Sequence, residues 1–313
     1  MRRRLLCAAA AALSLLALPS AATAAAPLVV GIGEQSDGIF ASAPWYRLGA
    51  RDVRYVVSWD ALDSKWQRDE VDAYMAAAEN AGARVLLGFN RSRSQSKARR
   101  KLLPSPRRFR QVFLRFRARY PFITTYLTWD EANHRGQPTW NHPAVVGRYY
   151  DILRDNCRSC TIVAPSVLDT LAMPRWVKQV ERHAKHRIGI WGLHNYIDAN
   201  RFRTSGTRSL LRATKAKIWF TETGGLVRRD NGSRIEFADS PKHAVKATRW
   251  VLKLARLSPR VRRIYFYHWT APAPDATWDS ALTDRRGRPR PAYAVVRTFV
   301  RRIRAASRKR AGR

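Results

Sequence analysis

The sequence predicts a single-domain α/β fold in which eight parallel strands, each followed by a helix, close into a (β/α)8 barrel, the TIM-barrel architecture. Three observations lead to this prediction. Short apolar segments alternate with longer amphipathic ones along most of the 313 residues. Most of these apolar segments lack the alternation of a half-buried strand, which is typical of strands covered on both faces. They also recur roughly every 30 residues, the length of one strand–helix unit in such barrels.

The predicted strands are rich in Val, Ile, Phe, Tyr and Trp, which favour extended structure. No division into two halves interrupts the series, so a closed barrel is favoured over an open, doubly wound sheet. The eight strands are expected at residues 28–32, 53–59, 84–89, 123–129, 161–167, 189–194, 217–221 and 263–268.

Helix signals lie between these strands. Gly82 provides a C-terminal cap for a helix over 67–81. Ser-Pro pairs at 105 and 240 mark the starts of two more helices, because proline suits the first helical turn. Only a short helix candidate, at 44–48, follows the first strand. The other helices are expected at 105–120, 143–156, 174–185, 207–215, 240–257 and 291–304.

The N-terminal residues have the features of an export signal. Arg2–Arg4 precede an apolar run at 5–18, and Ala22-Thr23-Ala24 offers a small-residue cleavage site. We therefore expect a secreted or cell-wall-associated monomer without membrane insertion. The expected organisation is a signal peptide at 1–26, a barrel at 27–300 and a basic, disordered tail at 301–313.

The chain is strongly basic, with 59 Lys and Arg against 23 Asp and Glu and a formal net charge of +36. Such a charge raises the question of nucleic-acid binding. No zinc-finger spacing, RNP pattern or basic zipper accompanies it, and export argues against a physiological nucleic-acid partner. The basic segments at 91–101 and 301–313 either are solvent-exposed faces without a binding role or attract an anionic cell-envelope polymer.

Two cysteines, Cys157 and Cys160, lie beyond the signal segment. In an exported protein this pair predicts a local disulfide bond. A zinc site would need two more ligands, and His183 and His186 stand among basic residues of a predicted helix, which indicates a surface position. The sequence therefore predicts neither a metal nor a cofactor.

Two of the predicted strands lead into a glutamate. The strand at 123–129 runs into Asp130-Glu131, and the strand at 217–221 runs into Glu222. The carboxyl ends of all strands meet at one face of such a barrel, so these two side chains are expected to converge there. A pair of carboxyl groups is what cleavage of a glycosidic bond requires, one as acid and one as nucleophile or base. The alternative is that both are loop carboxylates that balance the basic surface.

These strand ends resemble glycoside hydrolase clan A. Trp129-Asp130-Glu131-Ala132-Asn133 is similar to the strand-4 motif Trp-Asn-Glu-Pro-Asn, and Thr221-Glu222-Thr223-Gly224 is similar to the strand-7 nucleophile motif. The resemblance covers about residues 28–300. It includes Arg54 and Trp59 on strand 2, His194 and Tyr196 on strand 6, Trp269 on strand 8, and the closing segment 278–293.

The resemblance implies a retaining glycoside hydrolase, free of cofactors, that cleaves β-linked polysaccharides or oligosaccharides. It implies that Glu131 donates a proton and then acts as base, while Glu222 attacks the anomeric carbon. Arg54 and the Tyr196 hydroxyl would keep Glu222 ionised, and neighbours would raise the pKa of Glu131. The implied substrate-binding residues are Arg54, Trp59, Asp130, Asn133, His194, Tyr196 and Trp269, with Trp269 as the sugar platform and Trp59, Trp140 and Trp278 extending it.

One departure from the family pattern concerns the residue before the acid, where Asp130 replaces asparagine. An ionised aspartate accepts hydrogen bonds but donates none, and it adds a negative charge beside Glu131. The substitution points to an altered substrate, a lower pH optimum or a decayed site. It supports a second candidate function, a non-catalytic protein that binds the cell envelope or a glycan. Arg54, His194, Tyr196 and Trp269 also remain open to a purely structural interpretation.

Overall fold

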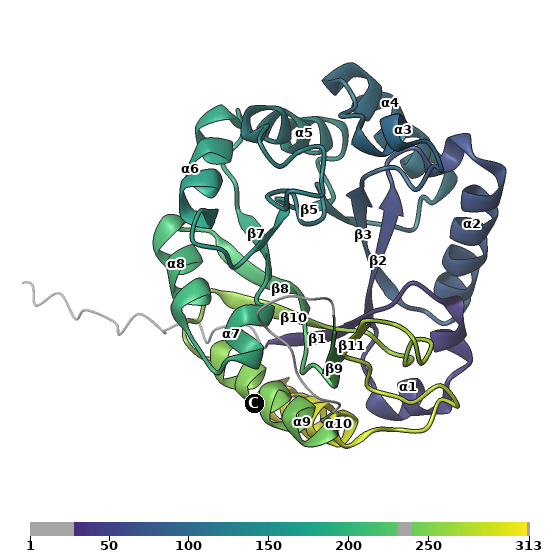
Figure 1. The fold of residues 1–313 in the computed structure, drawn as a ribbon, viewed down its shortest axis with the longest axis vertical. Coiled ribbons are helices and arrows are strands. Elements are labelled where there is room, and N and C mark those ends of the chain that lie inside the picture. Colours follow the sequence, from purple (N-terminus) through teal and green to yellow (C-terminus); the bar gives the residue numbers. More distant parts are fainter. Residues whose placement is uncertain (1–27, 231–239, 312–313) are drawn as a thin grey trace, which may run out of the picture.

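A computed structural model describes residues 28–230 and 240–311. The predicted signal peptide at 1–26 lies outside the described residues. In Figure 1 the strands form an inner ring and the helices an outer ring around it. The fold is the (β/α)8 barrel that the sequence predicts.

Each of the eight predicted strands is present. The fifth is divided into two short strands on either side of Ala164 and Pro165. The barrel strands are β1 (Val29–Gly33), β2 (Asp52–Ser58), β3 (Arg84–Asn90), β4 (Thr125–Leu127), β5 (Thr161–Val163), β6 (Ser166–Leu168), β7 (Ile190–His194), β8 (Lys217–Thr223) and β10 (Val261–Tyr267).

The barrel is closed through the divided fifth strand. The parallel strands hydrogen-bond in the order β5-β4-β3-β2-β1-β10-β8-β7-β6, so β5 pairs with β4 and β6 pairs with β7. The Ala164 N–H donates to the Ile190 carbonyl at 2.8 Å, and the Ser166 N–H donates to the Trp129 carbonyl at 2.9 Å. The same stretch of chain therefore bonds to both of its neighbours, and the sheet has no free edge there.

The helices that cover the barrel lie where the sequence places them. The Ser105 and Ser240 hydroxyls accept hydrogen bonds from backbone N–H groups of the first helical turn, as their predicted capping role requires. Gly82 has φ 62° just after the second helix, a left-handed conformation that glycine adopts without strain. The helices are α1 (Ala43–Leu48), α2 (Lys65–Asn80), α4 (Pro106–Arg119), α5 (Pro143–Asn156), α6 (Met173–His183), α8 (Ser205–Ala213), α9 (Pro241–Leu254) and α10 (Pro291–Ala311).

Several short elements were not predicted, because they hold too few residues to show a periodic pattern. The two-residue strands β9 (Arg228–Arg229) and β11 (Trp278–Asp279) form an antiparallel ribbon that is separate from the barrel sheet. The other additional elements are α3 (Lys97–Lys101), α7 (Tyr196–Asn200) and the 3-10 helices η1 (Asp37–Ala41) and η2 (Ala61–Asp63).

The prediction of a disordered tail from residue 301 is wrong for most of that segment, because α10 continues to Ala311. The segment contains Ala, Arg and Lys, which favour helices, and no glycine or proline before Gly312. Ile303 also packs against the hydrophobic core and anchors the added turns. Among the described helices, none is both long enough and apolar enough to span a bilayer.

Side chains fill the barrel interior beneath the carboxyl ends of the strands. Leu86, Leu127, Val163, Trp219 and Tyr265 come from five different strands and form a buried cluster distinct from the outer core. This packing gives the strand ends a solid floor. The predicted disulfide bond joins Cys157 and Cys160 between α5 and β5.

Candidate active site

Glu131 and Glu222 lie at the same end of the barrel. Glu131 stands in the loop after β4, and Glu222 lies near the end of β8. Both side chains line a cavity of about 620 Å³, here called the carboxylate cavity. The structure therefore brings the two predicted carboxyl groups together at the carboxyl ends of the strands.

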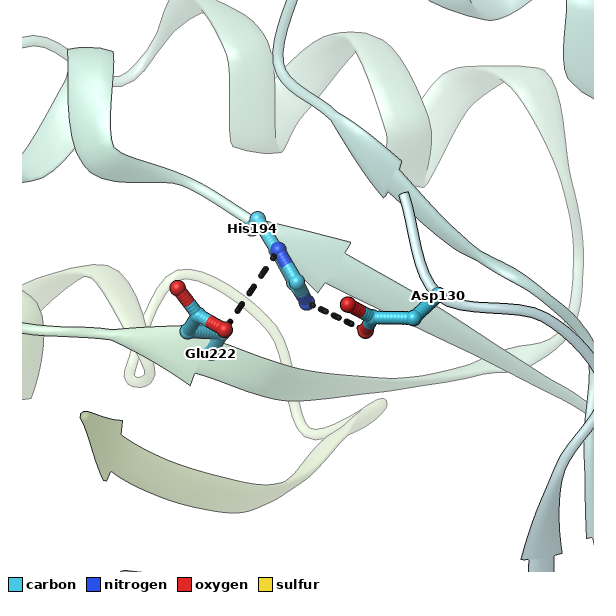
Figure 2. Close-up of side chains that lie close together, drawn as sticks. All are labelled: Asp130, His194 and Glu222. Carbon is cyan, nitrogen blue, oxygen red and sulfur yellow. Dashed lines mark ion pairs between the residues drawn. The ribbon is translucent and has the colours of Figure 1, made fainter. Parts of the chain in front are cut away.

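The two glutamates share one imidazole nitrogen. The Nδ1 atom of His194 lies 3.1 Å from Oε1 of Glu131 and 4.0 Å from Oε2 of Glu222. Its Nε2 atom lies 3.5 Å from Oδ1 of Asp130. Figure 2 shows the imidazole between Glu222 and Asp130. Burial opposes the charged imidazole, but the negative charges of Glu222 and Asp130 and the hydrogen bond to Glu131 raise the pKa of His194.

Arg54 on β2 contacts two of the buried acids. Its Nη2 atom lies 2.7 Å from Oε2 of Glu222 and 2.9 Å from Oδ1 of Asp130. The side chain is only 2% exposed, so these ion pairs lie away from solvent. Burial disfavours its charge, but the two carboxylates raise the pKa of Arg54 above its usual value.

Asp130 is held on several sides as an ionised group. It accepts hydrogen bonds from Arg54, from the Ser166 hydroxyl at 3.0 Å and from the Asn90 amide at 3.4 Å. Burial opposes its ionisation, but Arg54 and His194 lower the pKa of Asp130 below the usual value. Its carboxylate therefore belongs to the buried ion-pair network.

The expectation for Glu222 requires a correction. Burial raises the pKa of Glu222, and the charges of Asp130 and Glu131 add to this effect, although Arg54 and His194 oppose it. Asp130 takes part of the interaction with Arg54 that the resemblance assigns to Glu222 alone. Among the described residues, no hydrogen bond joins the Tyr196 hydroxyl to Glu222, so it does not stabilise the Glu222 carboxylate directly.

Glu131 has a strained backbone. Its φ of 49° is uncommon for a residue with a side chain and costs on the order of 1 kcal/mol. The Ser166 hydroxyl accepts a hydrogen bond from the Glu131 N–H at 2.7 Å, and the Ser166 carbonyl accepts one from the Ala132 N–H at 2.9 Å. Ser166, which the sequence did not single out, thus holds Asp130 and Glu131 in place from β6.

Five of the seven predicted substrate-binding residues do not line the cavity: Arg54 and Asp130 lie in the buried ion-pair network, and Trp59, Asn133 and Trp269 lie elsewhere. Trp269 is 1% exposed and its indole N–H donates to the Ser42 hydroxyl at 3.2 Å. Trp59 is equally buried. The Asn133 amide makes two hydrogen bonds to the backbone of Leu168, at 2.8 and 3.2 Å. Each of these side chains is occupied in packing or hydrogen bonding within the protein.

Other aromatic residues form the wall of the cavity. Tyr196, Tyr267 and Trp278 line it, and the rings of Tyr196 and Trp278 meet edge to face with centroids 4.8 Å apart. Trp140, which the sequence suggested as a further platform, is 43% exposed and lies outside this lining.

Five charged or titratable residues of the cavity were missed: His134, Asp169, Arg229, Tyr267 and His268. Asp169 follows β6, and one of its oxygens accepts a hydrogen bond from the Asp198 N–H at 2.9 Å. Burial, together with the charge of Asp198, raises the pKa of Asp169 to about 7. Burial lowers the pKa of His268. Asp169 and His268 had a signal in the sequence, because Asp169 stands just beyond one predicted strand and His268 is the last residue of another.

The cluster of Asp130, His194 and Glu222 resembles a metal-ligand set. One ligand atom from each residue lies within 4.8 Å of the others, and such donors suit a divalent cation. The Nη2 atom of Arg54, however, already contacts both carboxylates. A metal ion there would face the positive guanidinium at close range, so these residues do not fit a metal.

Comparison with known proteins supports the fold. No family model matches the chain, and no curated protein sequence matches it. Xylanase 10B from Thermotoga petrophila, solved with xylobiose, superposes with a TM-score of 0.63 at 12% identity, over 88% of this chain and 94% of that chain. GH5_18 from Streptomyces cattleya, solved with GlcNAc, gives 0.63 at 17% identity, over 89% and 80%.

A third similar structure is larger than this chain. A β-glucuronidase from an uncultured Clostridium species superposes with a TM-score of 0.59 at 9% identity. The match covers 88% of this chain but spans only half of the glucuronidase. The chain thus has the (β/α)8-barrel fold of clan A glycoside hydrolases, the family that its strand-end motifs resemble.

Proposed function

We propose that the protein is a secreted retaining glycoside hydrolase that cleaves β-glycosidic bonds in a polysaccharide. The observation that carries this proposal is the convergence of Glu131 and Glu222 on one nitrogen of His194, at 3.1 and 4.0 Å, within the carboxylate cavity. Two carboxyl groups that approach the same imidazole nitrogen and line the same cavity can act on the two sides of a single glycosidic bond. The similar solved structures provide the fold-level support.

The proposed reaction has two steps. Glu131 donates a proton to the leaving oxygen while the Glu222 carboxylate attacks the anomeric carbon, so the glycosidic bond breaks and a glycosyl ester forms. Glu131, now ionised, then takes a proton from water. The water oxygen attacks the anomeric carbon, the ester bond breaks, and the sugar leaves with its original anomeric configuration.

The buried charges suit a shared proton. Arg54 provides one positive charge, and His194 provides a second when it is protonated, against the three carboxyl groups of Asp130, Glu131 and Glu222. When His194 is protonated, one proton shared among the three carboxyl groups brings the net charge of the cluster to zero. In the reactive state this proton resides on Glu131, which faces the cavity with a 29% exposed side chain, and Glu222 is ionised against Arg54.

The decisive experiment is covalent labelling of the purified protein by 2-fluoroglycosides, preceded by a screen of aryl β-glycosides and cell-wall polysaccharides. We expect the label on Glu222, located by peptide mass spectrometry. Glu222→Ala should lose turnover and labelling while keeping the circular dichroism of the folded protein. Glu79→Ala, on the exposed end of α2, is the matched control. Turnover by Glu222→Ala equal to that of the parent would contradict the mechanism.

A second candidate function is a non-catalytic protein that binds the cell envelope or a glycan. Asp130 supports it, because this residue shares Arg54 and helps to raise the pKa of the would-be nucleophile Glu222. Binding of a polysaccharide without turnover or labelling by any aryl or fluoroglycoside would favour this candidate over the hydrolase.

A further inference from the structure

A second cavity adjoins the carboxylate cavity. It has a volume of about 520 Å³, and Pro272 lines both cavities, so they are neighbours at the mouth of the barrel. Its charged lining consists of five arginines and two aspartates: Arg228, Arg285, Arg286, Arg288, Arg290, Asp279 and Asp284. We call it the arginine cavity.

The β9–β11 ribbon forms a wall between the two cavities. Arg229 pairs with Trp278 across the ribbon, and Arg228 pairs with Asp279. Successive side chains of a strand point to opposite faces. Accordingly, Arg229 and Trp278 line the carboxylate cavity, whereas Arg228 and Asp279 line the arginine cavity. In Figure 1 the ribbon lies inside the ring of helices.

Arg229 presents a half-buried positive charge to the carboxylate cavity. Its guanidinium carbon lies 5.2 Å from the centre of the Trp278 ring, and its Nε has no hydrogen-bond partner among the described residues. Burial and the nearby charge of Arg201 lower the pKa of Arg229, whereas the ion-paired Arg54 has a raised pKa. Among the residues that the structure describes, no carboxylate forms an ion pair with Arg229, although a partly desolvated cation favours such a partner.

The aspartates of the arginine cavity are already engaged. Asp279 contacts Arg290 at 2.8 Å, and Asp284 contacts Arg288 at 2.6 Å. Arg285 and Arg286 are exposed, and neither forms an ion pair with a described residue. The excess charge of this cavity thus lies beside the charge of Arg229 on the other side of the ribbon.

We propose that the two cavities bind an acidic polysaccharide, with Arg229 binding the carboxylate of a uronate residue in the carboxylate cavity. Arg285 and Arg286 bind further carboxylates of the same chain in the arginine cavity. A guanidinium binds a carboxylate through two parallel N–H donors in its plane, and stacking on an aromatic ring leaves that edge free. This inference names the substrate class of the proposed hydrolase and rests on that function, but the binding can be tested without turnover.

The test compares two β-1,4-linked ligands that differ at carbon 6. Oligoglucuronate carries carboxylates where cello-oligosaccharides of equal length carry hydroxymethyl groups. Binding is measured by isothermal titration calorimetry in the Glu222→Gln background, which prevents hydrolysis. We expect oligoglucuronate to bind at least tenfold more tightly than the neutral oligomer. Equal affinity for both would overturn the proposal and leave the hydrolase function untouched.

The variants separate the site from the overall charge. Arg229→Gln should weaken oligoglucuronate binding by about tenfold to a hundredfold, the effect of a lost charge-assisted pair. The affinity of Arg229→Lys for oligoglucuronate should lie between those of the parent and of Arg229→Gln, because lysine keeps the charge but lacks the planar donors. Arg285→Gln/Arg286→Gln should weaken binding of long oligomers more than that of the disaccharide. Circular dichroism checks the folding of each variant.

The control removes the same charge elsewhere. Arg301→Gln/Arg308→Gln, on exposed positions of the outer helix α10, should leave the affinity unchanged. Equal weakening by this control, or double-stranded DNA binding as tightly as oligoglucuronate, would show attraction by net charge alone and overturn the site. Tighter binding of sulfated cello-oligosaccharides than of oligoglucuronate would overturn the assignment to uronate.

Discussion

Asp130 and Glu222 share a single guanidinium nitrogen, the Nη2 of Arg54, at 2.9 and 2.7 Å. The motif that this stretch resembles has an asparagine at the first of these positions, which would leave Arg54 to pair with the proposed nucleophile Glu222 alone. Here the cation is divided between two buried carboxylates, and burial together with Asp130 raises the pKa of Glu222. Asp130, which stands where the motif has asparagine, thus competes with Glu222 for Arg54 and favours protonation of Glu222.

Replacing Asp130 by Asn should therefore keep or increase glycosidase activity. Without the second carboxylate, Arg54 interacts with Glu222 alone, so the pKa of Glu222 falls and the nucleophile is ionised at lower pH. We expect the acidic limb of the kcat/KM profile to move to lower pH. A folded but inactive Asp130→Asn variant of an active parent would exclude this exchange of amide for carboxylate.

Arg54 should be essential for stability as well as for the site. Arg54→Met leaves Asp130 and Glu222 buried without their cation, which should cost about 3–5 kcal/mol of unfolding free energy. The loss should increase with pH, because the unpaired carboxyl groups ionise less readily in the folded state than in the unfolded state. Urea denaturation at pH 5 and pH 8 measures both effects. Arg54→Lys keeps the positive charge, so its unfolding free energy should fall by less than that of Arg54→Met. A decrease below about 1 kcal/mol in Arg54→Met would contradict the role assigned to the ion pairs.

Asp169 should make the protein less stable as the pH rises. Its pKa is about 7 in the folded state against the ordinary value of 3.8. The penalty is absent below about pH 4, grows as the pH rises from about 4 to about 7, and stays constant above that. Asp169→Asn keeps an acceptor for the Asp198 N–H, so it should raise the unfolding free energy at pH 8 by on the order of a few kcal/mol and leave it unchanged near pH 4.

The matched control for this measurement is Asp275→Asn, which removes an exposed acid from the loop after β10. This variant should not change the difference in unfolding free energy between pH 4 and pH 8. A parallel shift of both variants would show that general charge, and not the burial of Asp169, sets the pH dependence.

The disulfide bond should contribute little to stability. Cys157 and Cys160 are separated by three positions in the chain, so their bond restricts only a short loop of the unfolded state. Cys157→Ala/Cys160→Ala should lower the unfolding free energy by about 2 kcal/mol or less. Thermal unfolding with and without a reductant measures this, and a loss of more than about 4 kcal/mol would indicate a larger structural role.

The strand pattern predicted the barrel because each strand is covered on both faces and each unit repeats with similar length. The same regularity placed Glu131 and Glu222 at one end, where the structure has them. The assignment of Trp269 as a platform depended on which way a strand-end residue points. The pairing of β10 with β8 shifts register between Ile264 and Phe266, and such irregularities break the simple alternation of faces. Tyr267 and His268 line the cavity instead.

Other parts of the site leave no pattern in the sequence. The β9–β11 ribbon consists of two-residue strands from loops far apart in the chain. Nothing in the sequence near Arg229 indicates that it meets Trp278. Likewise, the raised pKa of Glu222 results from its burial and from the charge of Asp130, which also pairs with Arg54. Both depend on how β2, β4 and β8 pack together.

The ribbon belongs to a different sheet from the strands that position the glutamates. Its two strands extend from the segments after β8 and β10, so substitutions there need not disturb the barrel ladder. This arrangement would allow the preference for ligands to diverge during evolution while the positions of Glu131 and Glu222 stay the same. Protein engineers could exchange the ribbon between related barrels to transfer selectivity for charged or neutral sugars.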